Sequence, residues 1–165
     1  MREIDVVKLY ELAGNDALKL DEEIYLFSRL LYHNFELKTF FEDGSIPAEA
    51  RKKMLVELHP DSSTLMRELI GLLIDQDLIR QLGWLAHHYS ELISRKTGAP
   101  LVEITSAQVL PEDQKKEIMR FTEGRRRFEV DPAIIGGVRI KWEDGRYLDA
   151  SLNGRFEALK EEILV

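Results

Sequence analysis

The signals that decide the fold are concentrated in one stretch, Val130-Asp-Pro-Ala-Ile-Ile-Gly-Gly-Val-Arg-Ile-Lys-Trp-Glu-Asp-Gly145. An Asp-Pro corner leads into apolar residues and a pair of glycines, Gly136 and Gly137. Apolar and basic residues then alternate up to Trp142, which predicts a half-buried strand, and the following Asp-Gly pair predicts a tight turn. Because glycines weaken a strand, the pair predicts a bulge or a close backbone approach.

The composition of the chain excludes several classes of protein. With 165 residues, 44% of them hydrophobic and 32% charged, the chain can build one ordinary or two small cores and is unlike a disordered protein. The net charge of -7 disfavours a protein that coats nucleic acid. The absence of cysteine excludes disulfides, thiol catalysis and thiolate metal sites. The sequence has no uncharged apolar run of about 18 residues, so no membrane span is expected.

Apolar residues recur at helical spacing up to about residue 96, which predicts a bundle of six helices. The expected helices cover approximately residues 9–13, 20–31, 34–41, 45–58, 62–75 and 77–97. Asp21 to Glu23 are expected in the first turn of the second helix. Ser45 and Asp77 are the expected caps of the fourth and sixth helices.

The spacing changes from helical to alternating after Gly98. Strands are predicted over residues 101–107, 128–130 and 138–142, and a helix over 111–121. A last helix would place four apolar residues on one face: Leu152, Phe156, Leu159 and Ile163. The sequence therefore predicts an α+β protein, with an N-terminal six-helix bundle over residues 1–97 and a small mixed α+β domain over 98–165.

Motifs of catalysis are missing from the sequence, including phosphate-binding glycine loops, zinc-protease motifs and nucleophile elbows. His87 and His88 would point about 100° apart on a helix, so we expect no shared metal ion. The arginines of 125–127 are interpreted as a solvated turn after a helix, with phosphate or RNA binding as the alternative. We predict no catalytic residue, no metal site and no cofactor.

Three ordered segments together resemble a known family: Ile104-Thr-Ser-Ala107, the stretch from Val130 to Gly145, and Asp149-Ala-Ser-Leu-Asn-Gly-Arg-Phe-Glu-Ala-Leu159. They are similar to the C-terminal domain of the delta subunit of rotary ATP synthases. This subunit is the counterpart of the oligomycin-sensitivity-conferring protein. Two earlier segments, 35–51 and 69–80, resemble the helix junctions of the same family.

The resemblance implies a non-catalytic subunit of the peripheral stalk, or stator, of a proton-translocating ATP synthase. In the family, the helical domain grips the N-terminal segment of an alpha subunit between its first and fifth helices. The C-terminal domain engages the b-subunit stalk. The chain starts without signal-peptide or transit-peptide features, so we expect a bacterial complex and a peripheral membrane protein on the cytoplasmic face of the plasma membrane.

The resemblance also assigns residues to these roles. The implied groove for the alpha segment is formed by apolar residues of two helices: Leu9, Tyr10, Ala13, Leu65, Leu69, Leu72 and Leu73. The family motif is expected to shape the C-terminal domain rather than to touch a partner: Asp131, Pro132, Ile135, Gly136, Gly137, Asp149 and Ser151. In particular, Asp149 or Ser151 is expected to cap the last helix.

The sequence departs from the family pattern near its start, where the first helix is short and broken near Gly14-Asn15. Two other functions therefore stay open at this point. One is a free regulatory or RNA-associated adaptor that uses the arginines of 125–127. The other is an enzyme with an acidic site at Asp21 to Glu23.

Overall fold

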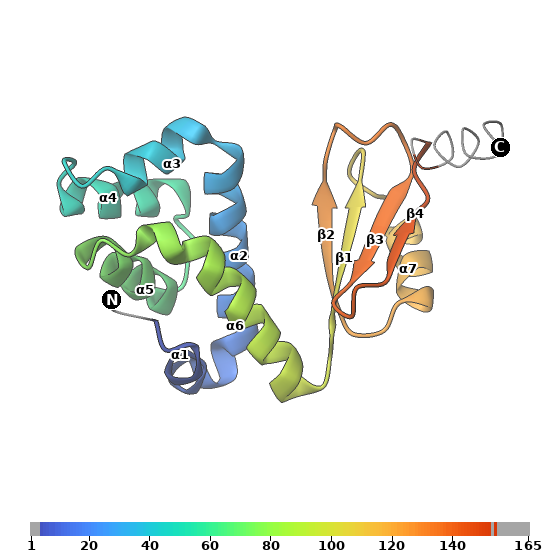
Figure 1. The fold of residues 1–165 in the computed structure, drawn as a ribbon, viewed down its shortest axis with the longest axis horizontal. Helices are drawn as coiled ribbons and strands as arrows, with labels where there is room; N and C mark the ends of the chain where they lie inside the picture. The colour runs from blue at the N-terminus through green and yellow to red at the C-terminus, as the bar shows by residue number, and fades with distance from the viewer. Residues whose placement is uncertain (1–3, 153, 155–165) are drawn as a thin grey trace. The chain divides into compact units, whose positions relative to one another are not determined.

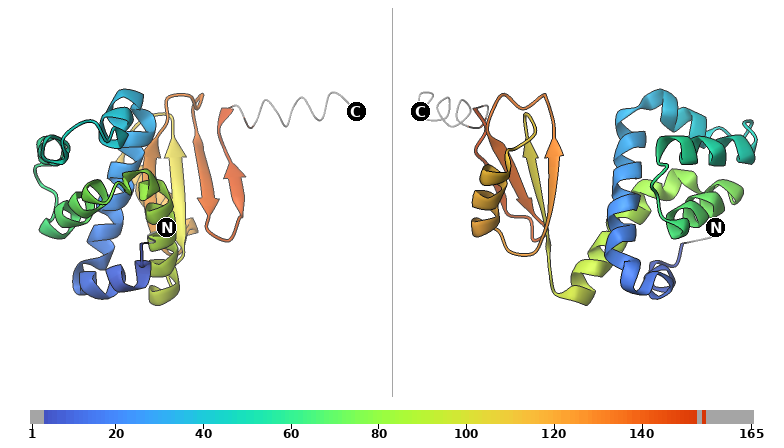
Figure 2. Two further views of the ribbon diagram at one scale, coloured as in Figure 1. Left: turned by 60° about the vertical axis from the view of Figure 1, so that its left-hand side comes forward. Right: turned by 180° about the vertical axis from the view of Figure 1, so that it is seen from behind.

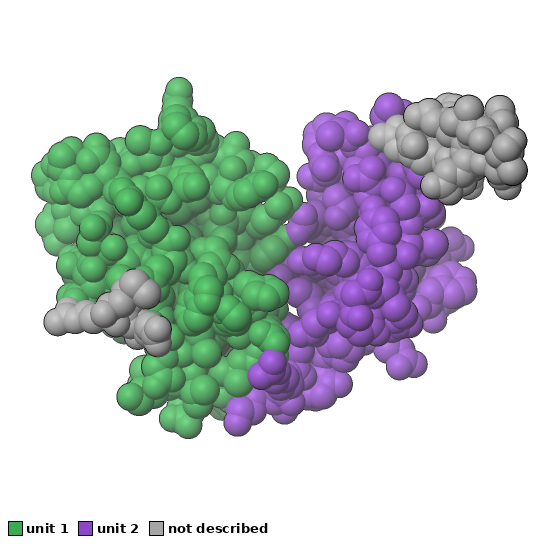
Figure 3. Space-filling model, viewed as in Figure 1, with its two compact units in different colours: residues 1–93 green, residues 94–165 purple. Residues whose placement is uncertain are grey.

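The computed structural model describes residues 4–152 and 154, and the chain divides into two compact units, residues 1–93 and 94–165 (Figure 3). The first unit is helical, and the second contains a mixed sheet. The predicted α+β class and the helix-rich N-terminal part are confirmed.

Six α-helices and two short 3-10 turns occupy residues 6–97 (Figure 1). In chain order they are α1 (Val6–Ala13), η1 (Gly14–Asp16), α2 (Ala17–His33), α3 (Phe35–Glu42), α4 (Ala48–Leu58), α5 (Thr64–Asp75), η2 (Ile79–Gln81) and α6 (Leu82–Thr97). Their shared core contains side chains that are almost fully enclosed, among them Phe27 and Phe41, whose rings meet edge to face at 5.2 Å. This packing, rather than helix propensity, holds such short helices together.

The start of α5 joins two helices. The Ser63 hydroxyl accepts a hydrogen bond from the backbone N–H of Met66 at 3.1 Å, which caps the helix. Glu23 of α2 in turn accepts from the Ser63 N–H at 2.7 Å and from its hydroxyl at 2.5 Å. Glu23 therefore fixes the position of α5 against α2.

The expected caps of the fourth and sixth helices are both wrong. The α4 helix begins at Ala48 after Pro47 and has no side-chain cap, while the N–H of Ser45 donates to Asp43. Asp77 does not start α6, which begins only at Leu82.

Asp77 instead ends α5, with a positive φ of 55°. Its N–H donates to the carbonyl of Ile74 at 3.2 Å, and the N–H of Leu78 donates to the carbonyl of Leu73 at 2.7 Å. This pair of bonds is the Schellman arrangement, in which a left-handed residue satisfies the last carbonyls of a helix. Glycine is the usual residue at this position, so an aspartate there does not indicate the end of a helix in the sequence.

We expect Asp77→Gly to raise the free energy of unfolding by about 0.5–1 kcal/mol, because glycine adopts the left-handed conformation without a steric penalty. Asp77→Ala is the matched control and should lower it, since alanine lacks even the local hydrogen bonding of aspartate. Urea unfolding followed by far-UV circular dichroism, which the helices dominate, measures both changes. Equal stabilities for the glycine and alanine variants would contradict the argument.

The second unit is built on a four-stranded sheet in the order β2-β1-β3-β4. Its elements are β1 (Leu101–Ser106), α7 (Glu112–Phe121), β2 (Arg125–Val130), β3 (Val138–Trp142) and β4 (Tyr147–Asp149). Strands β1 and β2 are parallel and are joined through α7, while β3 is antiparallel to both β1 and β4. The last strand, β4, was not predicted; it is only three residues long and lies at the sheet edge.

One face of the sheet packs against α7 (Figure 2). Val102, Ile104 and Ile140 are buried there, and Ile118 of α7 and Trp142 pack against them. The Asp144-Gly145 turn predicted after Trp142 is present, with Gly145 at a φ of 90°. Of the expected last helix, Phe156, Leu159 and Ile163 lie outside the described residues.

Candidate interaction surface

The α5 helix presents three leucines on one sector of its surface. At about 100° per residue, Leu65, Leu69 and Leu72 fall within roughly 60° of one another. Exposure increases across the sector, from 7% at Leu69 through half-buried Leu65 to 58% at Leu72. The adjacent flank of α5 faces α4, because the Lys52 amine lies 2.8 Å from Asp75 and a side-chain carbon of Lys52 lies near Gly71. Leu65 and Leu69 therefore lie away from α4, whereas Leu72 lies at the edge of the sector nearest to α4.

The α1 helix is short but well formed. Asp5 caps it by accepting hydrogen bonds from the N–H groups of Val7 and Lys8, both at 3.1 Å. These bonds, the one from Lys8 first, hold the pKa of the Asp5 carboxyl below its usual range. Gly14, at a φ of 52°, ends the helix. The departure from the family pattern near Gly14-Asn15 thus shortens α1 without dissolving it.

The seven residues predicted for the groove divide by burial. Four belong to the core of the helical unit: Leu9, Ala13, Leu69 and Leu73. Tyr10 and Leu65 are half-buried and pack against that core, and Leu72 is exposed. Two exposed apolar residues of α1 were not assigned to the groove from the sequence, Val7 at 44% and Leu12 at 77%. They lie off the core-facing stripe, and their apolar character on a solvent-facing side was the available signal.

A shallow groove of about 510 Å³ lies between α4 and α5. Val56 and Leu72 are exposed apolar residues along it, and its charged residues are Lys52, Arg67, Glu68 and Asp75. Sequence reasoning missed this groove, because it depends on how two helices pack. Leu72 therefore borders apolar surface on both sides of α5.

The family motif lies at one end of the sheet. Asp131 turns the chain after β2, since its carboxylate accepts from the N–H of Ala133 at 2.9 Å. Gly137 has a φ of 77°, and a Cβ there would lie 2.3 Å from the carbonyl oxygen of Ala150. The N–H of Leu152 donates to the carbonyl of Ile135 at 3.2 Å. The motif thus joins the loop before β3 to the residues after β4.

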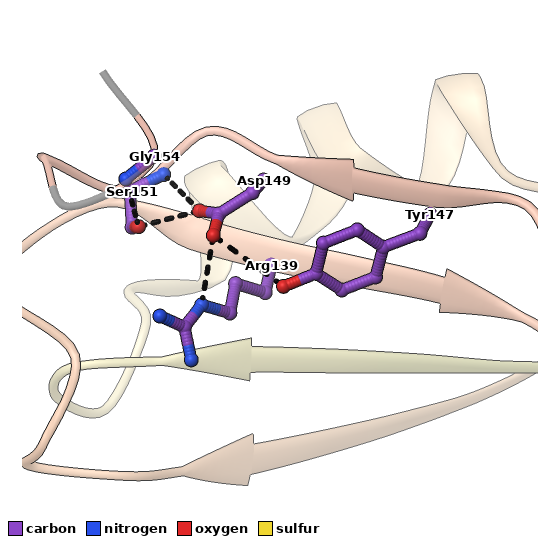
Figure 4. Close-up of polar contacts among 5 residues, drawn as sticks. All are labelled: Arg139, Tyr147, Asp149, Ser151 and Gly154. Carbon is purple, nitrogen blue, oxygen red and sulfur yellow. Dashed lines mark hydrogen bonds and ion pairs between the residues drawn. The ribbon is translucent and has the colours of Figure 1, made fainter. Parts of the chain in front are cut away.

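Asp149 organises the polar side of this junction (Figure 4). One carboxylate oxygen accepts from the Ser151 N–H at 2.9 Å and from the Ser151 hydroxyl. The other accepts from Arg139 Nε at 3.1 Å and from the Tyr147 hydroxyl at 3.4 Å. The Ser151 hydrogen bonds, together with the Arg139 charge, hold the pKa of Asp149 below its usual range.

Ser151 itself is fully buried, and its hydroxyl accepts from the N–H of Gly154, three residues later, at 3.2 Å. This is the hydrogen bond of an N-cap residue. Ile135, by contrast, is 59% exposed and Pro132 is exposed. Asp149, Ser151 and Gly137 are therefore positioned to shape the unit, whereas Ile135 is available to a partner.

The interpretation of the three consecutive arginines as a solvated turn is wrong. They begin strand β2, and Arg127 is only 5% exposed. Arg125 donates to the Ser94 hydroxyl at 2.8 Å, and Arg126 donates to the Met119 carbonyl at 3.1 Å. An edge strand such as β2 can carry arginines when their guanidinium groups find acceptors on the protein.

The first-turn position expected for Asp21 to Glu23 is also wrong, because α2 begins four residues earlier, at Ala17. Asp21 is 2% exposed and accepts a 3.4 Å hydrogen bond from the Ser90 hydroxyl of α6. Burial raises the pKa of Tyr89 above its usual range, and the charge of Asp21 adds to this effect. Glu23 holds the start of α5, so these carboxylates are engaged in packing rather than gathered in an open acidic site.

His87 and His88, expected not to share a metal ion, lie close to a third possible ligand. Their imidazoles and the carboxylate of Glu91 bring ligand atoms within 4.8 Å of one another on α6.

Among the described residues, no helix combines the length and apolarity needed to cross a membrane.

Comparison with known proteins identifies the family. The family model described as "ATP synthase delta (OSCP) subunit" matches residues 8–163. A relative from Moorella thermoacetica, named ATP synthase subunit delta, is 30% identical over 92% of this chain and 85% of its own length. Subunits of the same name from Trichormus variabilis and Flavobacterium psychrophilum are 31% and 27% identical, over 79% and 90% of this chain and 74% and 87% of theirs. The chain therefore belongs to the ATP synthase delta (OSCP) subunit family.

Proposed function

We propose that this subunit of the ATP synthase is a non-catalytic joint of the peripheral stalk, which links the alpha/beta head to the membrane-anchored b subunits. Family membership over nearly the whole chain is the observation that carries the proposal. A rotor that turns inside the head exerts torque on it, so the head must be held by contacts that dissociate slowly. Nanomolar contacts, worth about 12 kcal/mol, meet that requirement and need no site chemistry.

The helical domain, residues 1–97, acts in this proposal as a six-helix bundle that binds the N-terminal segment of an alpha subunit beside α1 and α5. The exposed apolar surface on these helices supports it: Leu72, half-buried Tyr10 and Leu65 would contact the segment. The predicted residues Leu9, Ala13, Leu69 and Leu73 would hold those contacts in place from the core. Docking of an amphipathic helix on such apolar surface is a common mode of recognition.

The C-terminal domain, residues 98–165, would engage the b-subunit stalk, and the complex would place the protein on the cytoplasmic face of a bacterial plasma membrane. Exposed Ile135, Leu148 and Leu152 on the second unit support a partner-binding role for it. The alternative of an RNA-associated adaptor receives no such support, because Arg125 and Arg126 donate to groups of the protein itself.

We expect Leu72→Asp to weaken binding of a synthetic alpha N-terminal peptide by at least about 30-fold, or roughly 2 kcal/mol, since a desolvated carboxylate would replace an apolar contact. Isothermal titration calorimetry with the full chain measures the affinity. Leu72 suits this test because it is exposed, whereas Leu69→Asp would bury a charge in the core and unfold the unit.

Leu148→Asp is the matched control, since Leu148 is 48% exposed and lies in the other unit. It should leave the affinity for the alpha peptide unchanged. If neither variant alters tight binding, the alpha segment binds elsewhere. If the unmodified protein does not bind the alpha peptide at tens of micromolar, the proposed contact with the alpha subunit is wrong.

A further inference from the structure

One exposed face of α6 carries an aromatic ring, two imidazoles and a carboxylate. At about 100° per residue, Glu91 lies one turn beyond His87 and His88 and falls between them around the helix axis. Trp84, one turn before, falls in the same sector. The helix thus brings together three potential metal ligands: two neighbouring histidines, His87 and His88, and Glu91, which follows His87 by four residues.

The separations suit a small metal ion. His88 Nδ1 lies 3.4 Å from Glu91 Oε2, and the ligand atoms of all three residues lie within 4.8 Å of one another. In a tetrahedral zinc site the ligand bonds measure about 2.0–2.2 Å, which places two ligand atoms roughly 3.4 Å apart. The pair of His88 and Glu91 already has this spacing, and a ligand atom of His87 lies within 4.8 Å of both.

Ring contacts hold His88 in place on the helix surface. Its imidazole lies 4.4 Å from the Trp84 ring, in a tilted arrangement, and 5.2 Å from the His87 imidazole. The side chains of His88 and Glu91 remain 38% and 34% exposed, so an ion can reach them from solvent. Ligands that are already oriented lose less conformational freedom when they bind.

The donor set selects the class of ion. Two imidazoles and one carboxylate suit zinc, copper or nickel, whereas calcium and magnesium require sites made of oxygen ligands. The single negative charge of the set partly neutralises a divalent cation. Three protein ligands leave a fourth position for water, as in open zinc sites.

We propose that His87, His88 and Glu91 form a surface site for a divalent transition-metal ion such as Zn²⁺. The ion clamps one turn of α6 and replaces the direct contact between His88 and Glu91. None of the three residues belongs to the groove proposed for the alpha segment, so the test of this site does not depend on that groove.

Isothermal titration of the untagged full chain with ZnCl₂ tests the proposal. We expect one saturable site of micromolar affinity and no binding of MgCl₂ under the same conditions. His87→Ala and Glu91→Gln should each weaken Zn²⁺ binding by about tenfold or more. His33→Ala is the matched control, since His33 is an exposed histidine at the end of α2 and outside the cluster.

Thermal unfolding gives a second readout. Because an ion that binds only the folded state stabilises it, saturating Zn²⁺ should raise the melting temperature of the wild type but not of the His87→Ala, Glu91→Gln double variant. The proposal is overturned if Zn²⁺ gives no saturable heat. It is equally overturned if the double variant binds as tightly as the wild type, or if His33→Ala causes the same loss.

Discussion

Gly137→Ala should lower the free energy of unfolding of the C-terminal unit by about 3 kcal/mol or more. Two costs combine. Gly137 has a φ of 77°, where a residue with a side chain is strained. The new Cβ would also lie 2.3 Å from the carbonyl oxygen of Ala150 and 2.8 Å from the Cα of Ser151. Backbone must move to relieve that overlap.

Gly145→Ala separates the two costs. Gly145 has a similar φ of 90°, but no atom lies within 4 Å of its Cβ position. It should therefore lose only the roughly 1–2 kcal/mol that a left-handed conformation costs. Similar losses for the two variants would contradict the close approach of Gly137 to Ala150.

The measurement needs a probe that reports on the C-terminal unit alone. The chain has two tryptophans, Trp84 in the first unit and Trp142 in the second. Urea unfolding of the full chain in a Trp84→Phe background, followed by fluorescence, reports on Trp142 only. Trp84 is 46% exposed, so its replacement should disturb the helical unit little.

The helices were largely predictable from sequence because their cores follow a simple period. Phe27, Leu69 and Ile93 fall on apolar stripes that the sequence displays, and each is buried. The errors arose at helix ends, and one of them is made by an uncommon residue. Asp77 ends α5 in a conformation that usually selects glycine, so it was interpreted as the start of the next helix.

The sheet was harder to predict, because its strands carry polar residues for tertiary reasons. Arg125 and Arg126 begin β2 because the hydroxyl of distant Ser94 and the carbonyl of Met119 in α7 accept their hydrogen bonds. Strand β4 pairs over three residues and has no apolar period of its own. Pairing with β3, rather than local sequence, makes it a strand.

The sequence places the candidate interaction residues on one side of a helix, but it does not show which of them are exposed. Helical spacing groups Leu65, Leu69 and Leu72, yet only the packed structure shows that Leu69 is enclosed while Leu72 meets solvent. The histidines give a similar lesson. From the sequence, the two histidines were considered alone, and the carboxylate of Glu91, whose ligand atom lies within 4.8 Å of theirs, was overlooked.

Asp149→Asn should lower the free energy of unfolding of the C-terminal unit by about 2–3 kcal/mol at neutral pH. The carboxylate accepts from Ser151, Arg139 and Tyr147, and an amide keeps only one oxygen for them. The NH₂ group of the amide would also face groups that donate hydrogen bonds. In addition, Arg139 would lose its negatively charged partner. The same Trp142 fluorescence measurement determines the loss.

Asp144→Asn is the matched control. Asp144 also pairs with an arginine, since Arg146 Nε donates to it at 2.8 Å. Its side chain is 56% exposed, however, so water replaces the lost contact and we expect a much smaller loss of stability. Equal losses at the two positions would show that the hydrogen bonds of Asp149 stabilise the unit no more than an exposed ion pair does.

The dependence of this loss on pH provides the stricter test. The pKa of Asp149 is lowered in the folded protein, so the unfolded chain binds a proton more readily than the folded one. The stability that Asp149 contributes is therefore present above its unfolded pKa, about 3.9, and disappears as the pH falls through the folded value. The difference in unfolding free energy between wild type and Asp149→Asn should shrink as the pH is lowered from about 7 to below about 3. Comparing the two proteins cancels the titration of the other carboxylates, because both chains contain them. A difference that stays constant over this range would mean that Asp149 acts through its shape and neutral hydrogen bonds, and that its charge does not hold β3 to the residues that follow β4.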